Sequence, residues 1–595
     1  MLAARHHLDD HGESSLFLTL LRTQEDASSH IAKYLTLQDL HHAVLSCKTA
    51  LVSALRHQAL RTTRLHLPPD ATRTEVIVSS MQRSVVPYVK DLEVADTRSV
   101  EALAGRLPSV RKLRINSDRF MLRDDPRFDL SHLRQFPSLV ELDLSAAGDL
   151  VDISGLEGLT SLRYLDLAHT AVHDITAVSS LPQLVELNLD TTPVASIQPL
   201  EGLTQLRVLN LSYTQQLRDL SPLRSLTRVR ELMLNQKSIL EVDSLLHIAG
   251  NLEHLEIADA NVQSLSIEAR EELVSALVNV DYLDLSWSRF IFRLDALMPL
   301  KRMRVLKLSG EKFADLAPLS SLPQLEELAI KQDVDVDLSV VGTLTNLRKL
   351  IIFGFRPHTS SVEFLGALPY LKQLEVSSLF RLGFPKLPHL KRLGVTVLSY
   401  SEYFKYPSAP NLTKLSIYSR VDINQVNQRF PYLRHLHLEE VDRISLHSLA
   451  QFTQLETLEI GRRSTSSQPF PEDHSFLRPL KQLRVLRILW TNITDLFVLT
   501  GMTALRELDL EGTPVRDVWH LTALTSLEKL SLGETKVRNI ADLTMLKNLK
   551  SITIPKHASC APLQDMFHSG AGLEHLREVI HPGQNCLWGR HRTQW

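Results

Sequence analysis

The sequence predicts an α/β repeat fold, a solenoid with one curved parallel β-sheet on its concave face and short helical or 3₁₀ turns on its convex face. Two observations predict this fold. The pattern L-x-x-L-x-L returns along most of the 595 residues, usually after 21 to 24 residues. A second apolar set with a spacing of three follows each copy, as in Ile153, Leu156 and Leu159.

The repeat is well preserved in its leucines. It spans Leu139 to Leu144 and returns at Leu162–Leu167 and Leu184–Leu189. The second leucine-type position is called the repeat marker here, and it occurs 21 times between Leu92 and Ile552. Leu65 and Leu576 are degenerate candidates for further markers at the two ends.

Each repeat predicts one strand and one turn. Leucines two residues apart point to the same side of a strand, so both enter the core while the residue between them faces solvent. The spacing of three in the second apolar set fits short 3₁₀ turns that return on the other side. One repeat cannot bury both apolar sets alone, whereas stacked neighbours can, and the solenoid follows.

These features resemble the leucine-rich repeat family over about residues 60–580. The wording Asp-Ile/Leu after the strand, as in Asp174-Ile175 and Asp495-Leu496, resembles the short 22-residue subclass seen in internalins. The family's Asn after the strand is replaced by Thr, and we expect the hydroxyl to bond the neighbouring loop backbone. The replacements are Thr170, Thr192, Thr214, Thr491, Thr513 and Thr535.

One long interval predicts a true helix. Between markers 255 and 283 the run Ser266 to Leu277 combines an N-cap serine with Glu268 in the first turn. This interval should therefore hold an α-helix where its neighbours hold 3₁₀ turns.

The N-terminal residues lack the repeat and predict a different organisation. Residues 1–25 read as a flexible tail, residues 26–60 as a small helical segment, residues 61–580 as the solenoid and residues 581–595 as a C-terminal tail. Tyr34-Leu35, Leu37 to Leu40 and Leu45 to Lys48 resemble the F-box, a helical motif that docks on an adaptor of cullin ubiquitin ligases. The resemblance implies adaptor contacts by Leu35, Leu37, Asp39 and Leu40. The alternative is a helical cap that covers the first core layer of the solenoid.

Composition and motifs give no sign of catalysis. The chain has no P-loop, zinc-protease or nucleophile-elbow motif. Cys47, Cys560 and Cys586 are too few for a disulfide framework and indicate a reducing compartment. We therefore expect no cofactor, no metal, no membrane insertion and an intracellular, cytoplasmic or nuclear location; the oligomeric state stays open. The 66 Lys and Arg against 68 Asp and Glu also disfavour nucleic acid as a partner.

The solvent-facing strand positions are the candidate interaction surface. The residue after the marker is acidic or an amide in six of seven successive repeats, including Asp143, Asp166, Glu256 and Asp284. This pattern favours a basic partner, although ordinary strand polarity explains it as well. Two residues before the marker a basic residue recurs, which is common repeat composition: Arg163, Arg207, Arg230, Arg304, Arg348, Lys372, Lys391, Arg434, Arg484, Arg506 and Lys550.

Aromatic residues provide the second set of candidates. Residues 353–432 hold 13 of the 35 Phe, Tyr and Trp residues of the chain. Such rings dominate interface hot spots, and their alternative role is to fill a stretch of core that is poor in leucine. The candidates are Tyr213, Trp287, Phe353, Tyr403, Phe404, Tyr418 and Trp490.

These patterns together predict a non-enzymatic protein-interaction protein. The F-box resemblance implies a substrate receptor of a cullin ubiquitin ligase, with the ligase adaptor as one protein partner. The alternative is a structural or regulatory scaffold, associated with a phosphatase or the cytoskeleton, that has no role in ubiquitin transfer.

Overall fold

The computed structural model has the fold of a leucine-rich-repeat solenoid, as the sequence predicts. It describes residues 64–66 and, between 90 and 580, all but these segments: 95–99, 102, 104–105, 116–129, 146, 236–241, 260–265, 289–292, 310–312, 314, 332–335, 355–361, 378–383, 397–406, 419–425, 440–445, 462–472, 560, 564–575 and 577. The predicted F-box-like or capping segment and both predicted tails lie outside the described residues. The domain boundaries therefore stay predictions.

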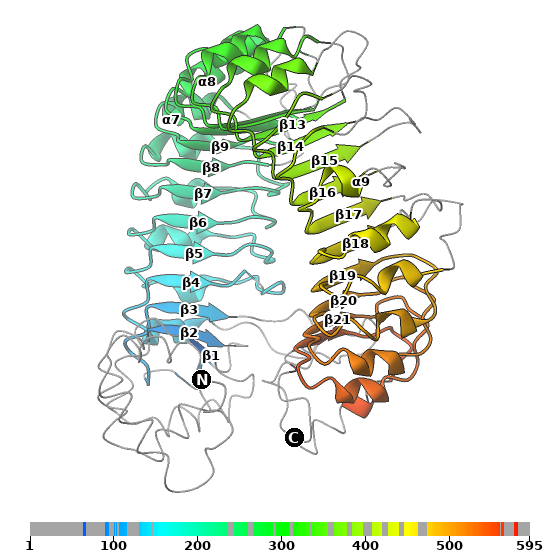
Figure 1. Ribbon diagram of the computed structural model, residues 1–595. Helices are drawn as coiled ribbons and strands as arrows, with labels where there is room; N and C mark the ends of the chain where they lie inside the picture. The colour runs from blue at the N-terminus through cyan, green and yellow to red at the C-terminus, as the bar shows by residue number, and fades with distance from the viewer. Residues whose placement is uncertain are drawn as a thin grey trace, which may run out of the picture. The chain divides into compact units, whose positions relative to one another are not determined.

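The described residues form two compact units, divided between Leu252 and Glu253. Within each unit the strands stack in parallel and in chain order (Figure 1). The strands of the first unit are β1 (Arg64–His66), β2 (Asp91–Val94), β3 (Lys112–Ile115), β4 (Glu141–Asp143), β5 (Tyr164–Asp166), β6 (Glu186–Asn188), β7 (Val208–Asn210) and β8 (Glu231–Met233).

The second unit continues the same pattern with longer strands in its first half. Its strands are β9 (His254–Glu256), β10 (Tyr282–Ser286), β11 (Val305–Ser309), β12 (Glu327–Lys331), β13 (Lys349–Phe353), β14 (Gln373–Ser377), β15 (Arg392–Thr396), β16 (Lys414–Ile417), β17 (His435–Glu439), β18 (Thr457–Gly461), β19 (Val485–Ile488), β20 (Glu507–Asp509), β21 (Lys529–Ser531), β22 (Ser551–Thr553) and β23 (Glu578–Ile580).

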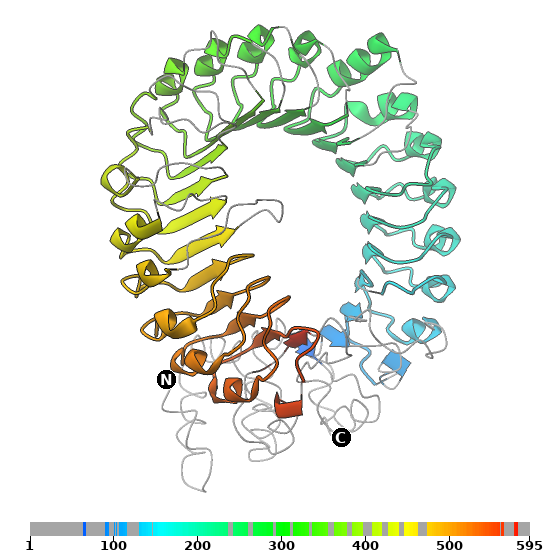
Figure 2. The same ribbon diagram turned by 90° about the vertical axis from the view of Figure 1, so that its right-hand side faces the viewer.

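Short helices return the chain between strands and lie on the opposite side of each repeat (Figure 2). The α-helices are α7 (Leu246–Ala249), α8 (Ile267–Ala276) and α9 (Val426–Arg429). The 3₁₀ helices are η3 (Ser131–Gln135), η4 (Ser154–Leu156), η5 (Thr176–Ser180), η6 (Gln198–Leu200), η7 (Ser221–Ser225), η8 (Val242–Leu245), η9 (Leu294–Leu297), η10 (Ala317–Ser321), η11 (Ser339–Thr343), η12 (Glu363–Ala367), η13 (Leu446–Gln451), η14 (Ser475–Leu477), η15 (Leu496–Leu499), η16 (Trp519–Ala523) and η17 (Ala541–Met545).

The aspartate of the Asp-Ile/Leu pair that follows many strands has a local structural role. The Asp174 carboxylate accepts a hydrogen bond from the Thr176 N–H at 2.8 Å, and Asp495 accepts one from the Phe497 N–H at the same distance. Such a side chain replaces a backbone partner at the start of the turn and so fixes where the 3₁₀ helix begins. Helix α8 begins as predicted, because the Ser266 hydroxyl accepts from the Ala269 N–H at 3.1 Å.

The strands pair marker to marker, which places every leucine layer in register. Leu65 pairs with Leu92, so the first degenerate candidate is a true marker. The last candidate was misplaced, because Ile552 pairs with Val579 rather than with Leu576. Leu576 is buried three residues earlier, in the position of the first leucine of the pattern.

Five of the six recurring threonines donate to a different backbone group from the one expected, and the buried Thr491 hydroxyl makes no such bond. The Thr170 hydroxyl donates to the Leu167 carbonyl at 2.7 Å, and Thr513 donates to Leu510 at 2.6 Å. The acceptor is thus the last strand leucine of the same repeat, three residues earlier, instead of the neighbouring loop. The bond closes the turn locally, which explains why a short hydroxyl can stand where the family has an amide.

In nine repeats of the described part of the chain, the strand leads into a corner with a left-handed backbone. Four residues after the marker, φ is positive in non-glycine residues, for example 55° at Thr191 and 61° at Trp287. Their N–H groups continue the ladder, as Thr191 donates to the Ser212 carbonyl at 2.9 Å. This position is called the left-handed corner here; its described members with positive φ are His169, Thr191, Tyr213, Asp259, Trp287, Gly354, Trp490, Gly512 and Glu534.

Candidate interaction surface on the strand face

The residues directly before and after each marker lie on the solvent side of the sheet, called the strand face here. Along β2 to β8 this face carries seven carboxylates against two cations, Lys112 and Arg114. The carboxylates are Asp91, Glu93, Glu141, Asp143, Asp166, Glu186 and Glu231. The first unit therefore presents the acidic face that the sequence predicts.

Asp143 is the compensated member of this acidic face. Its carboxylate pairs with the Arg114 guanidinium on β3 and accepts from the Ser145 hydroxyl at 2.7 Å. Partial burial works against the charge, but Ser145 and Arg114 outweigh it and lower the pKa of Asp143. Asp143 is therefore poorly suited to attract a basic partner.

Asp166 and Glu186 keep the acidic character. Burial raises the pKa of Asp166, although its carboxylate accepts from the Ala168 N–H at 2.9 Å. Burial and the nearby carboxylates of Glu231 and Glu141 raise the pKa of Glu186. These two groups lie on neighbouring strands, so a basic group placed between them would relieve unfavourable charge.

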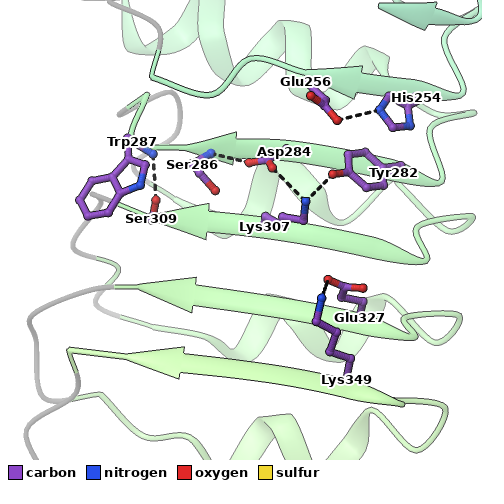
Figure 3. Close-up of polar contacts among 10 residues, drawn as sticks. All are labelled: His254, Glu256, Tyr282, Asp284, Ser286, Trp287, Lys307, Ser309, Glu327 and Lys349. Carbon is purple, nitrogen blue, oxygen red and sulfur yellow. Dashed lines mark hydrogen bonds and ion pairs between the residues drawn. The ribbon is translucent and has the colours of Figure 1, made fainter. Parts of the chain in front are cut away.

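In the second unit, the first strands carry an ordered polar cluster (Figure 3). The His254 ring stacks on the Tyr282 ring with centroids 3.9 Å apart, and its Nε2 lies 3.1 Å from Glu256 Oε1. On the next strand Asp284 accepts from the Ser286 N–H at 3.0 Å. The predicted residues Glu256 and Asp284 thus lie on neighbouring strands with fixed partners.

Lys307 on β11 is the centre of this cluster, and no sequence pattern singled it out. Its Nζ lies 3.2 Å from Asp284 Oδ2, donates to the Tyr282 hydroxyl, and sits 4.8 Å from the centre of the Tyr282 ring. Partial burial disfavours the ammonium, yet Tyr282 and Asp284 outweigh it and raise the pKa of Lys307. The cation is thereby fixed in the charged form, and Asp284 is neutralised like Asp143.

Trp287 stands at the left-handed corner that ends β10. Its N–H donates to the Ser309 carbonyl and lies within 2.9 Å of both that oxygen and the Ser309 hydroxyl. Its side chain is 61% exposed and extends beyond the strand end, away from the polar cluster (Figure 3). A large apolar ring is therefore presented to solvent by a backbone that two hydrogen bonds hold in place.

The other predicted aromatic residues take different places. Tyr213 and Trp490 occupy the same left-handed corner as Trp287 and are 48% and 45% exposed. Phe353 is half-buried at the end of β13, with Lys331 Nζ 5.3 Å above its ring. Tyr403 and Phe404 lie outside the described residues.

Tyr418 belongs to a second polar cluster on β17 to β20. Its ring centroid lies 5.3 Å from that of His437, whose Nδ1 is 2.9 Å from Glu459 Oε2. The Arg487 guanidinium then joins Glu459 to Glu507, with both contacts at 2.6 Å.

Trp287 and Trp490 end strands β10 and β19, about 40 Å apart along the sheet, and so do not form one site.

Sequence reasoning also missed an aromatic group on the turn side of the second unit. The His520 ring lies between those of Phe497 and Trp519, with centroids 5.4 and 3.5 Å away. Phe497 and Trp519 are both about half exposed, and the Arg478 guanidinium lies 5.7 Å from the Phe497 ring. Their position could have revealed them, because both stand 11 residues after a marker, where Thr176 and Gln198 are polar.

The two polar clusters, around Lys307 and around Arg487, are built from paired charged groups. In the described part of the chain, no group of His, Cys, Asp and Glu could hold a metal ion. No helix in that part is long and apolar enough to cross a bilayer. What the described face offers is exposed aromatic rings beside rigid charged groups, which is the usual composition of a recognition surface.

Comparison with known proteins concerns the fold alone. No family model and no curated protein matches the sequence. An internalin of Listeria monocytogenes shares 20% identity over 71% of this chain and 89% of its own, with a TM-score of 0.26. A leucine-rich-repeat protein of Leptospira interrogans shares 15% over 82% of this chain and 100% of its own, with a TM-score of 0.35.

A third solved structure is the leucine-rich-repeat ectodomain of a plant membrane receptor kinase from Arabidopsis thaliana, in complex with Casparian strip integrity factor 2. It shares 14% identity over 90% of this chain and 77% of its own, with a TM-score of 0.36.

Proposed function

We propose that this chain is a non-enzymatic protein-recognition scaffold that binds its partner through the strand face of the second unit, beginning at β9 to β11. The observation that carries the proposal is Trp287, a 61% exposed indole held at a left-handed corner beside the Lys307 cluster. Burying such a ring against a partner is a common source of hot-spot energy.

The surrounding geometry supports this role through preorganisation. The Trp287 backbone is held by Ser309, and the cation of Lys307 is held by Tyr282 and Asp284. Binding then costs little ordering entropy, because the contacting groups are already positioned. The hydrogen bonds also leave the cluster no unpaired buried charge that a partner would need to satisfy.

The finer proposal is that residues 26–60 act as an F-box and make the chain a substrate receptor of a cullin ubiquitin ligase. Its support is the resemblance of Leu35, Leu37, Asp39 and Leu40 to the adaptor-binding residues of that motif. A structural or regulatory scaffold without a ubiquitin role is the alternative. The reducing compartment that the three cysteines indicate is compatible with both.

Affinity capture with the full-length chain tests both levels. We would compare the wild-type chain with Trp287→Ala and with Thr191→Ala, a control at another left-handed corner. A partner that binds the wild type and the control but is lost from Trp287→Ala supports the recognition site. Retention of every partner by Trp287→Ala contradicts it.

The same capture separates the two finer roles. A cullin and its adaptor among the bound proteins, in all three chains, support the F-box proposal. Their absence, with other partners present, supports the scaffold alternative.

A further inference from the structure

In the second unit, the second residue before each marker forms a row along the N-terminal ends of the strands, and this row is mostly charge-compensated. Glu326 bridges two cations, with Oε1 2.7 Å from Arg304 and Oε2 3.4 Å from Arg348. Glu528 does the same for Arg506 and Lys550, at 3.4 and 2.6 Å. The recurring basic residues are therefore, in these repeats, components of ion-pair chains.

The compensation stops at β14 to β16. There the row carries Lys372 and Lys391, and the adjoining residue before the marker adds Arg392 and Lys414. All four side chains are exposed, and among the described residues none of them forms an ion pair. These four residues are called the basic edge here.

Cations of this edge also act on a histidine of the next strand. His435, on the next strand, is partly buried, and the cations of Lys414, Arg392 and Arg434 add to that burial to lower its pKa against the opposing Glu456. Arg434 itself pairs with Glu456 at 2.6 Å, which is where the compensated row resumes.

The nearest strand-face carboxylate, Glu375 on β14, accepts from the Gln373 amide at 2.8 Å. It leans over Gly394, where an added Cβ would lie 3.0 Å from its Cγ. This carboxylate thus has its own partner on the strand face, and within the described ranges it forms no ion pair with the four cations of the edge.

We propose that the basic edge binds an acidic segment of a protein partner, in an extended conformation across β14 to β16. Neighbouring strands are about 4.8 Å apart, so the four cations span about 10–15 Å, the length of three to five extended residues. Charge complementarity identifies the occupant, because a carboxylate-rich chain supplies the counter-ions that Glu326 and Glu528 supply elsewhere in the row.

A protein segment fits better than a nucleic acid. The net charge of the chain is −2, and a general nucleic-acid binder shows a strongly basic balance. The four residues of the edge also include no aromatic ring on which a base could stack. The patch is thus short and purely electrostatic, as suits a few carboxylates.

The test uses full-length protein and fluorescence anisotropy with a labelled peptide of about ten residues that alternates glutamate and serine. The same peptide with glutamine in place of glutamate is the neutral probe. The variant Lys391→Gln/Lys414→Gln is compared with Arg506→Gln/Lys550→Gln, which changes net charge equally in the compensated part of the row.

We expect the wild type to bind the acidic probe and not the neutral one, with affinity falling as salt rises. Lys391→Gln/Lys414→Gln should weaken binding about tenfold, and the matched control should change it less than twofold. Trp287→Ala should leave this affinity unchanged, so failure here and failure of the proposed recognition site are distinguishable.

Three results would overturn the proposal: no binding of the acidic probe, equal losses in both double variants, or tighter binding of a single-stranded RNA of the same charge.

Discussion

At the scale of single residues, two neighbouring aspartates at the same repeat position have opposite effects on the stability of the fold. Asp143 and Asp166 are aligned partners on β4 and β5. The pKa of Asp143 is lowered by Ser145 and Arg114 against partial burial, whereas burial raises the pKa of Asp166. The first carboxylate therefore stabilises the fold at neutral pH and the second opposes it.

We predict that Asp166→Asn raises the free energy of unfolding at pH 7 and that Asp143→Asn lowers it, each by about 0.5–1 kcal/mol. Asn188 and Asn210 already make the same turn bond with an amide oxygen, so Asp166→Asn keeps its local contact. A raised folded pKa removes stability as pH rises through it, and a lowered one adds stability above the unfolded value of 3.8.

The Asp166 difference should vanish as the pH falls below 3.8 and the carboxyl becomes protonated, whereas the Asp143 difference should shrink only below 3.8, as the pH falls through its lowered pKa. Free energies of unfolding measured across this range check the prediction. The same sign for the two variants at pH 7 would contradict it.

The left-handed backbone at Trp287 costs conformational free energy. In the free protein the ring is exposed, so burial of the ring does not offset this cost. A left-handed backbone costs a bulky L-residue about 1–2 kcal/mol, and glycine avoids this cost. We predict that Trp287→Gly is more stable than Trp287→Ala by about 1 kcal/mol, while both lose the partner that the proposed site binds. Denaturant unfolding of the two variants measures the first difference. Equal stabilities would show that the corner is unstrained.

At the scale of elements, the corners of successive repeats pack on one another. A Cβ added to Gly512 would lie 2.4 Å from Cδ2 of the Trp490 ring, and φ at Gly512 is +71°. Glycine is therefore favoured at this position for two reasons. Its backbone is left-handed, and a side chain would clash with the indole of Trp490 in the preceding repeat.

We predict that Gly512→Ala destabilises the protein by about 2–3 kcal/mol, because it adds a steric clash to the backbone strain. In the background Trp490→Ala the same change should cost only the strain, about 1 kcal/mol. A double-mutant cycle of unfolding free energies measures the coupling. Additive effects would mean that the ring moves aside without cost.

The elements of the solenoid were predictable because each follows from local chemistry. Leucine spacing fixes the strands, an Asp such as Asp174 fixes the start of several 3₁₀ helices, and Ser266 fixes the start of α8. The last marker was misassigned because Leu576 and Val579 both fit a leucine-type position, and only strand pairing distinguishes them. The threonine acceptor was missed because a hydroxyl can reach either its own turn or the next one.

The candidate site was less predictable, since its chemistry depends on contacts between repeats. Asp284 was selected as a free acidic group, but Lys307 comes from the next strand and neutralises it. Trp287 and Trp490 were selected for their place just past a strand, which is a property of their own repeat; both rings are exposed, and their role in binding stays a prediction. The sequence alone does not distinguish the basic edge from the other basic residues of the row. The distinction depends on the ion pairs that Glu326 and Glu528 form with other residues of the row.

At the scale of the whole molecule, the N-terminal segment decides between the two finer roles. We predict that replacing Leu35, Leu37 and Leu40 by polar residues abolishes adaptor binding and leaves the solenoid folded, as circular dichroism and the thermal midpoint would show. The physical reason is that an F-box contributes apolar contacts to the adaptor, whereas a cap contributes them to the solenoid core.

A fragment of residues 60–595 supplies the complementary result. If it still binds the adaptor, the F-box proposal is excluded. If it aggregates, the helical segment is a cap.

The marker-to-marker register has a consequence for how such a chain changes length over generations. Leu187-Asn188-Leu189 and Leu209-Asn210-Leu211 are identical triplets at equivalent positions of paired strands. An in-frame loss of residues 188–209 joins Leu187 to Asn210 and leaves an uninterrupted strand sequence, and a tandem duplication does the reverse. Because each repeat contacts only its neighbours, the cost of either event is confined to one interface. Unequal recombination can therefore lengthen or shorten the recognition surface in whole steps, without passing through a misaligned intermediate.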